Sequence, residues 1–313
     1  MRAVGITEYG GADRLQLMEV PAPSPGPGEE LIDVLLSGVN FADVSRRRGT
    51  YDATSDLPVV LGAEVVGRAR ADGRRVAALT GGFGGYAETA VAPTDLVFDI
   101  PDDVADEQAA AVLMQGLTAA AVINDAGQLD AGGTVAIHGA AGGVGSLAIQ
   151  FARRVGAGRI VAVASSTEKR AQALRTGADR AIAADPDGLS ARLLDANDGR
   201  GYDLIAEMVG GRMFDESVVA LAPTGRLVSY GRAGGQPPAL SRSDVTVVDF
   251  SLLDLLRTDP GALQAPARRL FEAIEAGALE PVLGRIYDAS DAASAHRALE
   301  DRTSIGKLLL RWA

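Results

Sequence analysis

The 313-residue chain contains no cysteine, only two histidines (His138 and His296) and only two lysines (Lys169 and Lys307). The absence of cysteine excludes disulfide bonds, thiolate zinc sites and a cysteine nucleophile. No apolar run reaches membrane-spanning length, and the amino-terminal segment MRAVGITEYG lacks the basic and apolar regions of a signal peptide. We therefore expect a cytoplasmic protein that does not bind a membrane.

Basic residues are outnumbered by acidic ones, 30 to 41, which gives a net charge of −11. This balance argues against nucleic acid as the main partner. Hydrophobic residues make up 47% of the chain and charged residues 23%, a composition typical of a folded protein rather than a disordered one. The length favours two domains.

The most informative stretch is residues 134–155, TVAIHGAAGGVGSLAIQFARRV. It predicts a buried strand, a tight glycine turn and an amphipathic helix, because its apolar residues recur at helical spacing after the glycines. This order suits pyrophosphate binding, since glycines let the backbone approach the phosphates and the helix N-terminus attracts negative charge. The candidate cofactor-binding residues here are Gly142, Gly143, Val144 and Gly145. The alternative is an ordinary strand-to-helix turn.

A second strand is expected at residues 159–164, followed by SSTEKR. An NAD site usually has an acidic residue at this strand end, but this chain has Ser165, with Lys169 and Arg170 one helical turn later. The missing carboxylate and the two cations favour the 2′-phosphate of NADPH. The alternative is structural: residues 165–168 form a helix capping box and Lys169 is a solvated helix residue.

Residues 1–100 are predicted to be rich in strands separated by glycine and proline, which indicates an antiparallel, barrel-like domain. From residue 134 onward, strands and helices alternate, which is typical of a doubly wound parallel sheet. Strands are expected at 134–139, 159–164, 180–184, 202–209, 225–231 and 245–250, with helices at 143–155, 167–176, 188–196 and 212–221.

The segment 244–250 follows no crossover helix and is therefore predicted to be an edge strand that pairs two subunits. Two helices, 266–276 and 290–301, precede a last strand at 306–311. We expect this last strand to return to the first domain.

Several strings in the chain carry a family resemblance. They are SGVNFADVSRRRGTY (37–51), LGAEVVG (61–67), GGYAETAVAP (84–93), QGLTA (115–119), HGAAGGVGSLAIQFAR (138–153), GRLVSYG (225–231) and SIGKLLL (304–310). With these strings in this order, the chain resembles the zinc-free quinone oxidoreductase (zeta-crystallin-like) branch of the medium-chain dehydrogenase/reductase superfamily.

The resemblance implies an α/β protein in which a Rossmann doubly wound domain is joined to a GroES-like β-barrel catalytic domain. The expected bounds are 113–256 for the Rossmann domain and 1–112 with 257–313 for the catalytic domain. It also implies NADPH in the cleft between the domains, and a homodimer. Five further residues match family positions near the cofactor or substrate: Asn40, Tyr51, Thr118, Gly231 and Lys307. Asn40 would lie beside the nicotinamide, and Tyr51 would donate a proton or cover the barrel.

The same resemblance argues against a catalytic zinc ion. Where zinc-dependent relatives have a cysteine and a histidine, this chain has Asn40 and Ala63. We expect His138 to be a packed, hydrogen-bonded residue and His296 to be inert on a polar helix. The run Arg46, Arg47 and Arg48 is interpreted as a solvated helix face, or else as a cationic entrance for a large acyl carrier.

Three functions fit these observations. The first is an NADPH-dependent reductase that transfers hydride to a quinone or a similar conjugated carbonyl without zinc. The second is an enoyl-thioester or enone reductase of a biosynthetic pathway. The third is an NADPH-binding protein with little turnover. The fold alone does not fix the substrate.

Overall fold

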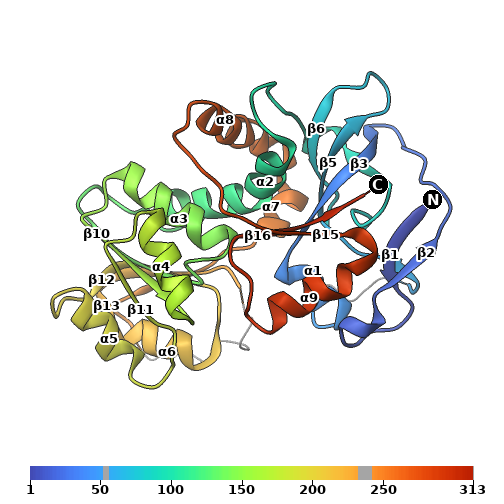
Figure 1. Cartoon of the computed structure of the whole chain (residues 1–313). Helices are drawn as coiled ribbons and strands as arrows, with labels where there is room; N and C mark the ends of the chain where they lie inside the picture. Colours follow the sequence, from blue (N-terminus) through green and yellow to red (C-terminus); the bar gives the residue numbers. More distant parts are fainter. Residues whose placement is uncertain (52–55, 232–241, 313) are drawn as a thin grey trace. The chain divides into compact units, whose positions relative to one another are not determined.

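The computed structural model describes residues 1–51, 56–231 and 242–312 (Figure 1). The chain forms two compact units. The first unit consists of Met1–Leu117 and Leu253–Ala313, and the second of Thr118–Leu252. The domain boundaries expected from the sequence lie a few residues from those of the units and remain a prediction.

The second unit is built on a six-stranded sheet in the order β11-β10-β9-β12-β13-β14, with every neighbouring pair parallel. The strands are β9 (Thr134–His138), β10 (Arg159–Ala164), β11 (Arg180–Ala183), β12 (Tyr202–Glu207), β13 (Leu221–Ser229) and β14 (Thr246–Asp249). The helices are α3 (Gly143–Val155), α4 (Thr167–Thr176), α5 (Leu189–Ala196) and α6 (Gly211–Val219). The predicted doubly wound α/β fold is confirmed, and β14 is the edge strand of this sheet.

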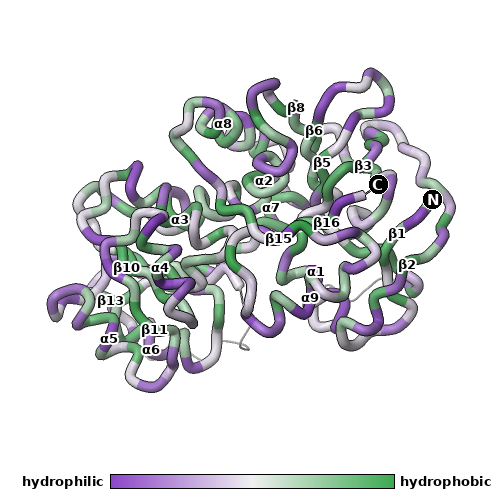
Figure 2. The backbone as a smooth tube through the Cα atoms, in the orientation of Figure 1, coloured by the Kyte–Doolittle hydropathy of each residue, from purple (hydrophilic) through white to green (hydrophobic). Residues whose placement is uncertain are grey.

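The order of these strands has a topological switch between β9 and β12, because successive strands run outward in opposite directions from this pair. Ligands of doubly wound sheets bind outside the carboxyl ends of the strands at such a point. All five residues of β9 are buried, which explains its continuous apolar run. Figure 2 shows hydrophobic residues concentrated in the strands and hydrophilic residues in many of the turns.

The first unit contains a larger sheet in the order β15-β16-β3-β5-β6-β8, with β7 also paired to β3. Its strands are β3 (Glu29–Val39), β5 (Glu64–Ala69), β6 (Arg75–Leu79), β7 (Thr89–Pro93), β8 (Val97–Asp99), β15 (Leu283–Asp288) and β16 (Lys307–Arg311). A three-stranded sheet contains β1 (Arg2–Ile6), β2 (Gln16–Glu19) and β4 (Val59–Val60). The predicted return of the last strand is confirmed, because β16 pairs antiparallel with β3.

The remaining helices vary in length from seven to fifteen residues. They are α1 (Phe41–Arg47), α2 (Asp106–Ala120), α7 (Leu252–Thr258), α8 (Gln264–Glu275) and α9 (Ala292–Glu300). Helix α2 continues into a π-helical turn, Ala121–Asp125. Short 3-10 turns occupy Ala12–Arg14, Thr94–Leu96, Pro260–Leu263 and Ala289–Asp291. No helix in the described part of the chain is both long enough and apolar enough to span a membrane.

Strand β15 and helix α7 are among the elements that were not expected from the sequence. Strand β15 has only one fully buried residue, Tyr287, and is held at the sheet edge by β16. Its apolar pattern is therefore weak. Strand β13 begins at Leu221, where the sequence predicted the end of a helix, because Tyr202 of β12 pairs with Leu221 in parallel register.

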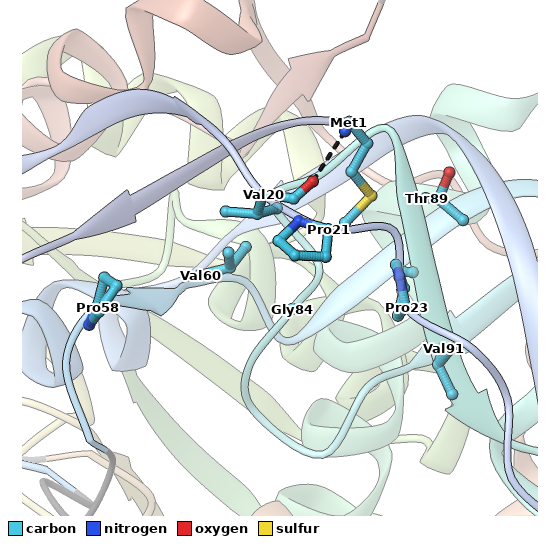
Figure 3. Close-up of a pocket in the computed structure, with 10 residues that line it drawn as sticks. Met1, Val20, Pro21, Pro23, Pro58, Val60, Gly84, Thr89 and Val91 are labelled. Atoms are coloured by element: carbon cyan, nitrogen blue, oxygen red, sulfur yellow. Dashed lines mark hydrogen bonds between the residues drawn. The ribbon is translucent and has the colours of Figure 1, made fainter.

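A mainly apolar surface pocket of the first unit lies beside the amino terminus (Figure 3). It is lined by Met1, Val20, Pro21, Pro23, Pro58, Val60, Gly84, Thr89, Ala90 and Val91. The terminal ammonium donates to the Val20 carbonyl at 2.9 Å. None of the site residues predicted from the sequence lines this pocket.

Candidate active site

The glycine turn that follows β9 is shaped by close backbone contacts. Gly139 has a φ of +59°, which favours glycine. Gly142 is the N-cap of α3 and donates to the Gly139 carbonyl at 2.9 Å. A Cβ on Gly145 would lie 2.4 Å from the Gly139 oxygen, so only glycine fits there without movement.

This arrangement leaves Gly143 and Val144 in the first turn of α3, both partly exposed. First-turn N–H groups have no acceptor within their own helix and lie at its positive dipole end. The turn thus has the properties of a pyrophosphate cradle at the switch point of the sheet.

The segment after β10 presents polar groups on the first turn of α4. Ser165 is exposed, and Lys169 and Arg170 are partly buried. The helix is capped by Ser166, whose Oγ accepts from the Lys169 N–H at 3.2 Å. The capping box expected at Ser165 is therefore wrong by one residue. The Arg170 guanidinium donates within its own turn, to the Ala164 carbonyl at 3.3 Å and to Thr167 Oγ1 at 3.0 Å.

The carboxyl end of β12 contains a buried acid that sequence reasoning missed. Glu207 accepts from the Val209 N–H at 2.7 Å and the Gly210 N–H at 3.0 Å, and burial raises its pKa to about 7. The following loop packs tightly: a Cβ on Gly231 would lie 2.8 Å from the Met208 oxygen. Gly231 lies just after β13, and its backbone packs against the backbone of Met208, which follows β12. The only sequence signal for Glu207 was its position at the end of an apolar strand.

His138 is fully buried, as expected for a packed residue. Its Nε2 lies 3.0 Å from Ser217 Oγ, and that hydroxyl donates to the Met213 carbonyl. The hydroxyl hydrogen is therefore used, so Nε2–H donates to Ser217 and Nδ1 carries no proton. Burial lowers the pKa of His138 to about 4.

In the first unit, four buried side chains form a hydrogen-bonded group that we call the amide cluster: Asn40, Glu64, Gln115 and Lys307. Asn40 Nδ2 donates to Glu64 Oε1 at 3.0 Å and to the Gly38 carbonyl at 3.4 Å. Asn40 Oδ1 accepts from Gln115 Nε2 at 2.6 Å and from Lys307 Nζ at 2.7 Å. Lys307 Nζ also lies 2.5 Å from Glu64 Oε1.

The cluster places two sequence candidates, Asn40 and Lys307, in direct contact with each other. The side-chain amide of Asn40 is fully hydrogen-bonded, since its N–H groups and its oxygen all have partners. A contact between this amide and a ligand would have to replace one of these hydrogen bonds. Glu64 and Gln115 lie in the strings LGAEVVG and QGLTA, but they were not selected as site residues from the sequence.

A second buried network begins at Asp43 in α1. Asp43 Oδ2 accepts from the Asn40 backbone N–H at 2.9 Å and from the Tyr86 hydroxyl at 3.1 Å. Tyr86 contacts His296 Nε2 at 3.2 Å, and Arg47 Nη1 lies 3.4 Å from His296 Nδ1. Arg47 also pairs with Glu300 of α9. His296 is buried because this face of α9 packs against α1, and the expectation that it is inert stays a prediction.

The interpretation of the arginine run as a solvated helix face is also wrong for two of its three members. Arg46 and Arg47 are buried, whereas the side chain of Arg48 is 50% exposed. The Arg46 guanidinium carbon lies 5.2 Å from the ring centroids of both Tyr51 and Phe83. Tyr51 itself is 37% exposed. The ring of Tyr51, a candidate site residue in the sequence analysis, therefore stacks on the buried Arg46 guanidinium.

Thr118 lies in the last part of α2 and is partly buried. It is the first residue of the second unit, and Gln115 of the same helix belongs to the first.

Comparisons with known proteins give a consistent result. Residues 26–102 match the alcohol dehydrogenase GroES-like domain, and residues 143–273 match the zinc-binding dehydrogenase family. The chain is 32% identical to a quinone oxidoreductase of Pseudomonas aeruginosa, over 99% of each protein. The chain belongs to the quinone oxidoreductase branch of the medium-chain dehydrogenase/reductase superfamily.

Two further similarities of this quinone oxidoreductase family member concern a solved structure and a biosynthetic enzyme. Its structure is similar to the quinone oxidoreductase of Thermus thermophilus, described together with its NADPH complex, with a TM-score of 0.87, 35% identity and full coverage of both chains. It is also 30% identical to a large phenolphthiocerol/phthiocerol polyketide synthase polypeptide of Mycobacterium tuberculosis, over 97% of this chain and 14% of that protein.

The matching family carries zinc in its name, but the residues of this quinone oxidoreductase family member do not fit the metal. The sequence has no cysteine, and Ala63 provides no ligand. Asn40 is held by the Lys307 ammonium, a positive charge already in place beside Glu64. No group of three or more potential ligands occurs among residues 1–51, 56–231 and 242–312.

Proposed function

We propose that this protein is an NADPH-dependent reductase that transfers hydride to a quinone or a similar conjugated carbonyl without zinc. The observation that carries this proposal is the glycine turn at the sheet's switch point, where a Cβ at Gly145 would collide with the Gly139 carbonyl. The NADPH complex of the Thermus relative and the activity named for the Pseudomonas relative support it.

In this proposal the second unit binds the cofactor. Gly142, Gly143, Val144 and Gly145 hold the pyrophosphate through backbone N–H groups. Ser165, Lys169 and Arg170 hold the 2′-phosphate of NADPH, since no acidic side chain follows β10 at this position. Thr118 and Gly231 contribute further contacts to the cofactor.

The cofactor, when bound, supplies a hydride to an electron-poor carbon of the acceptor. Electrons then collect on the conjugated oxygen, which takes a proton, so the acceptor gains one hydride and one proton. Tyr51, with a partly exposed ring, is the proposed proton donor. Asn40 and Lys307 act through the amide cluster, in which each fixes the other.

A second candidate is reduction of the double bond of an enone or enoyl thioester. The polyketide synthase relative supports this candidate, because the matched region covers nearly the whole of this chain. The same proton donor would serve, since an enolate oxygen or its α-carbon also takes up a proton.

The first experiment is to follow NADPH oxidation by the purified protein with para-quinones, simple enones and a crotonyl thioester. Quinone-selective turnover supports the first function, and turnover selective for the enone or the thioester supports the second. Tight NADPH binding without turnover of any acceptor would contradict both and would favour a binding protein.

The proposal includes a homodimer formed through segment 244–250. Within residues 1–51, 56–231 and 242–312, strand β14 lies at the edge of the six-stranded sheet, and it contains Val247 and Val248. An unpaired strand edge with apolar residues favours pairing with another chain. Sedimentation analysis would test this, and a monomer at micromolar concentration would contradict it. The cytoplasmic location remains a prediction.

A further inference from the structure

Arg46 is a charged residue in a buried position. It lies on α1 and only 3% of it is exposed. Burying a guanidinium removes it from water at a cost of several kcal/mol, unless charge partners and hydrogen bonds compensate. Among the described residues, its Nε and Nη1 are buried and have no hydrogen-bond partner.

The ion pair between this guanidinium and Asp43 is long. Arg46 Nη1 lies 3.5 Å from Asp43 Oδ1, which is itself buried without a hydrogen-bond partner in the described part of the chain. Burial raises the pKa of Asp43, whereas the nearby Arg46 charge acts to lower it. Its other oxygen is used by Tyr86 and the Asn40 N–H. Arg47 differs sharply, because it pairs with Glu300 and donates to the Gly10 carbonyl.

The flanking residues complete the environment of the cation. The rings of Tyr51 and Phe83 lie on the guanidinium with equal separations of 5.2 Å. Gly82 covers one end, since a Cβ there would lie 2.7 Å from Arg46 Nη2. The guanidinium thus stacks against two rings, which fixes its plane without engaging Nε or Nη1 in a hydrogen bond.

We propose that Arg46 is a specificity-determining residue that selects conjugated carbonyl acceptors carrying a carboxylate. The anionic oxygens accept hydrogen bonds from the Arg46 guanidinium, and the conjugated part of the acceptor lies along the Tyr51 and Phe83 rings. A planar guanidinium matches a carboxylate better than an ammonium does. This inference rests on the proposed function, because it assigns a substrate class to the same reductase.

The test compares one acceptor with and without its charge: (E)-4-oxo-2-pentenoic acid and its methyl ester. The two compounds differ in intrinsic reactivity, so the measured quantity is the acid-to-ester ratio of kcat/KM for each variant. We expect Arg46→Met to lower this ratio at least tenfold and Arg46→Lys to lower it less. Arg48→Met is the matched control, because Arg48 is adjacent and half-exposed, and it should leave the ratio within about twofold of wild type.

A second readout does not depend on turnover. Benzoate and benzamide have similar shapes, and their affinities for the NADPH-loaded protein are compared by calorimetry. We expect wild type to bind benzoate at least tenfold more tightly than benzamide, and Arg46→Met to abolish the difference. Equal binding by wild type would overturn the inference, even if Arg46→Met failed to fold. A folded Arg46→Met protein with an unchanged acid-to-ester ratio would overturn it as well. If no acceptor were reduced, the proposed function would fail, while the benzoate comparison would still decide the role of Arg46.

Discussion

The Nζ atom of Lys307 lies 2.7 Å from Oδ1 of Asn40, which joins the last strand of the chain to the N-cap of α1. Both residues are buried, and the same ammonium neutralises Glu64. A residue 267 positions away in the sequence thus determines which way the Asn40 amide points.

Replacing Lys307 with methionine should strongly destabilise the protein. Glu64 would lose its buried counter-ion, which typically costs about 3–5 kcal/mol. Chemical denaturation monitored by the fluorescence of Trp312 measures this change. The double variant Glu64→Gln, Lys307→Met should recover most of the loss, because no uncompensated charge remains. A single variant as stable as wild type would show that the pair does not contribute to folding.

Replacing Lys169 with alanine should weaken NADPH binding far more than NADH binding. The lost ammonium would no longer attract the 2′-phosphate, and we expect about a tenfold weaker Kd for NADPH, equivalent to about 1.4 kcal/mol. Fluorescence titration with both cofactors measures the effect. Arg175→Ala, in the last turn of the same helix, serves as the control. Equal losses for both cofactors would remove the assignment of the 2′-phosphate to Lys169.

Replacing Tyr51 with phenylalanine should slow reduction of enones more than reduction of quinones. Water can protonate the oxygens of a reduced quinone, so loss of the hydroxyl matters less there. General acid catalysis contributes on the order of 100-fold or more, and we expect an effect of about that size on enones. Tyr9→Phe is the control, because Tyr9 is equally exposed at 37%. Unchanged rates with both acceptors would end the role of Tyr51 as an acid.

Each of the two buried histidines should contribute stability that is lost below neutral pH, whereas Glu207, whose pKa burial raises to about 7, acts in the opposite direction. Burial lowers the pKa to about 4 for His138 and, together with Arg47, to about 3 for His296. Both would gain protons on unfolding near their ordinary pKa of 6.5. Their contribution is therefore complete above pH 6.5 and is lost progressively as the pH falls towards 3–4. By pH 5 we expect a loss of roughly 2 kcal/mol per histidine.

Denaturant unfolding of wild type and of His138→Gln at pH 7.5 and pH 5 isolates the contribution of His138, because all other titrating groups are common to both proteins. His138→Gln should make the pH dependence shallower, because the variant has one titrating group fewer. An identical slope in the variant would show that His138 does not titrate differently in the folded and unfolded chains.

The parts of the structure that could be predicted from the sequence are those in which neighbouring residues carry the pattern. The glycine turn and α3 were predictable because the strand, the glycines and the apolar spacing lie within one short segment. The amide cluster was not, because its members come from positions 40, 64, 115 and 307 and meet only through tertiary packing.

Burial of charge was equally hidden. Three consecutive arginines at 46–48 look alike in the sequence, yet two are buried and one is half-exposed. The difference arises from α9 and from the rings of Tyr51 and Phe83, which no local pattern connects to α1. Pattern reasoning assigns helical charges to solvent by default, and it fails where a distant element covers them.

Strand β16 occupies an interior place in the sheet of the first unit, between β15 and β3, although it is nearly the last segment of the chain. During synthesis, the second unit has all its strands before residues 307–311 are made. The first unit cannot complete its sheet until then, and β3 presents an open edge in the meantime. Distant strand pairing of this kind is slow and exposes partly folded chains to aggregation. We therefore expect loss of the last seven residues to leave a folded second unit attached to an incompletely folded first unit.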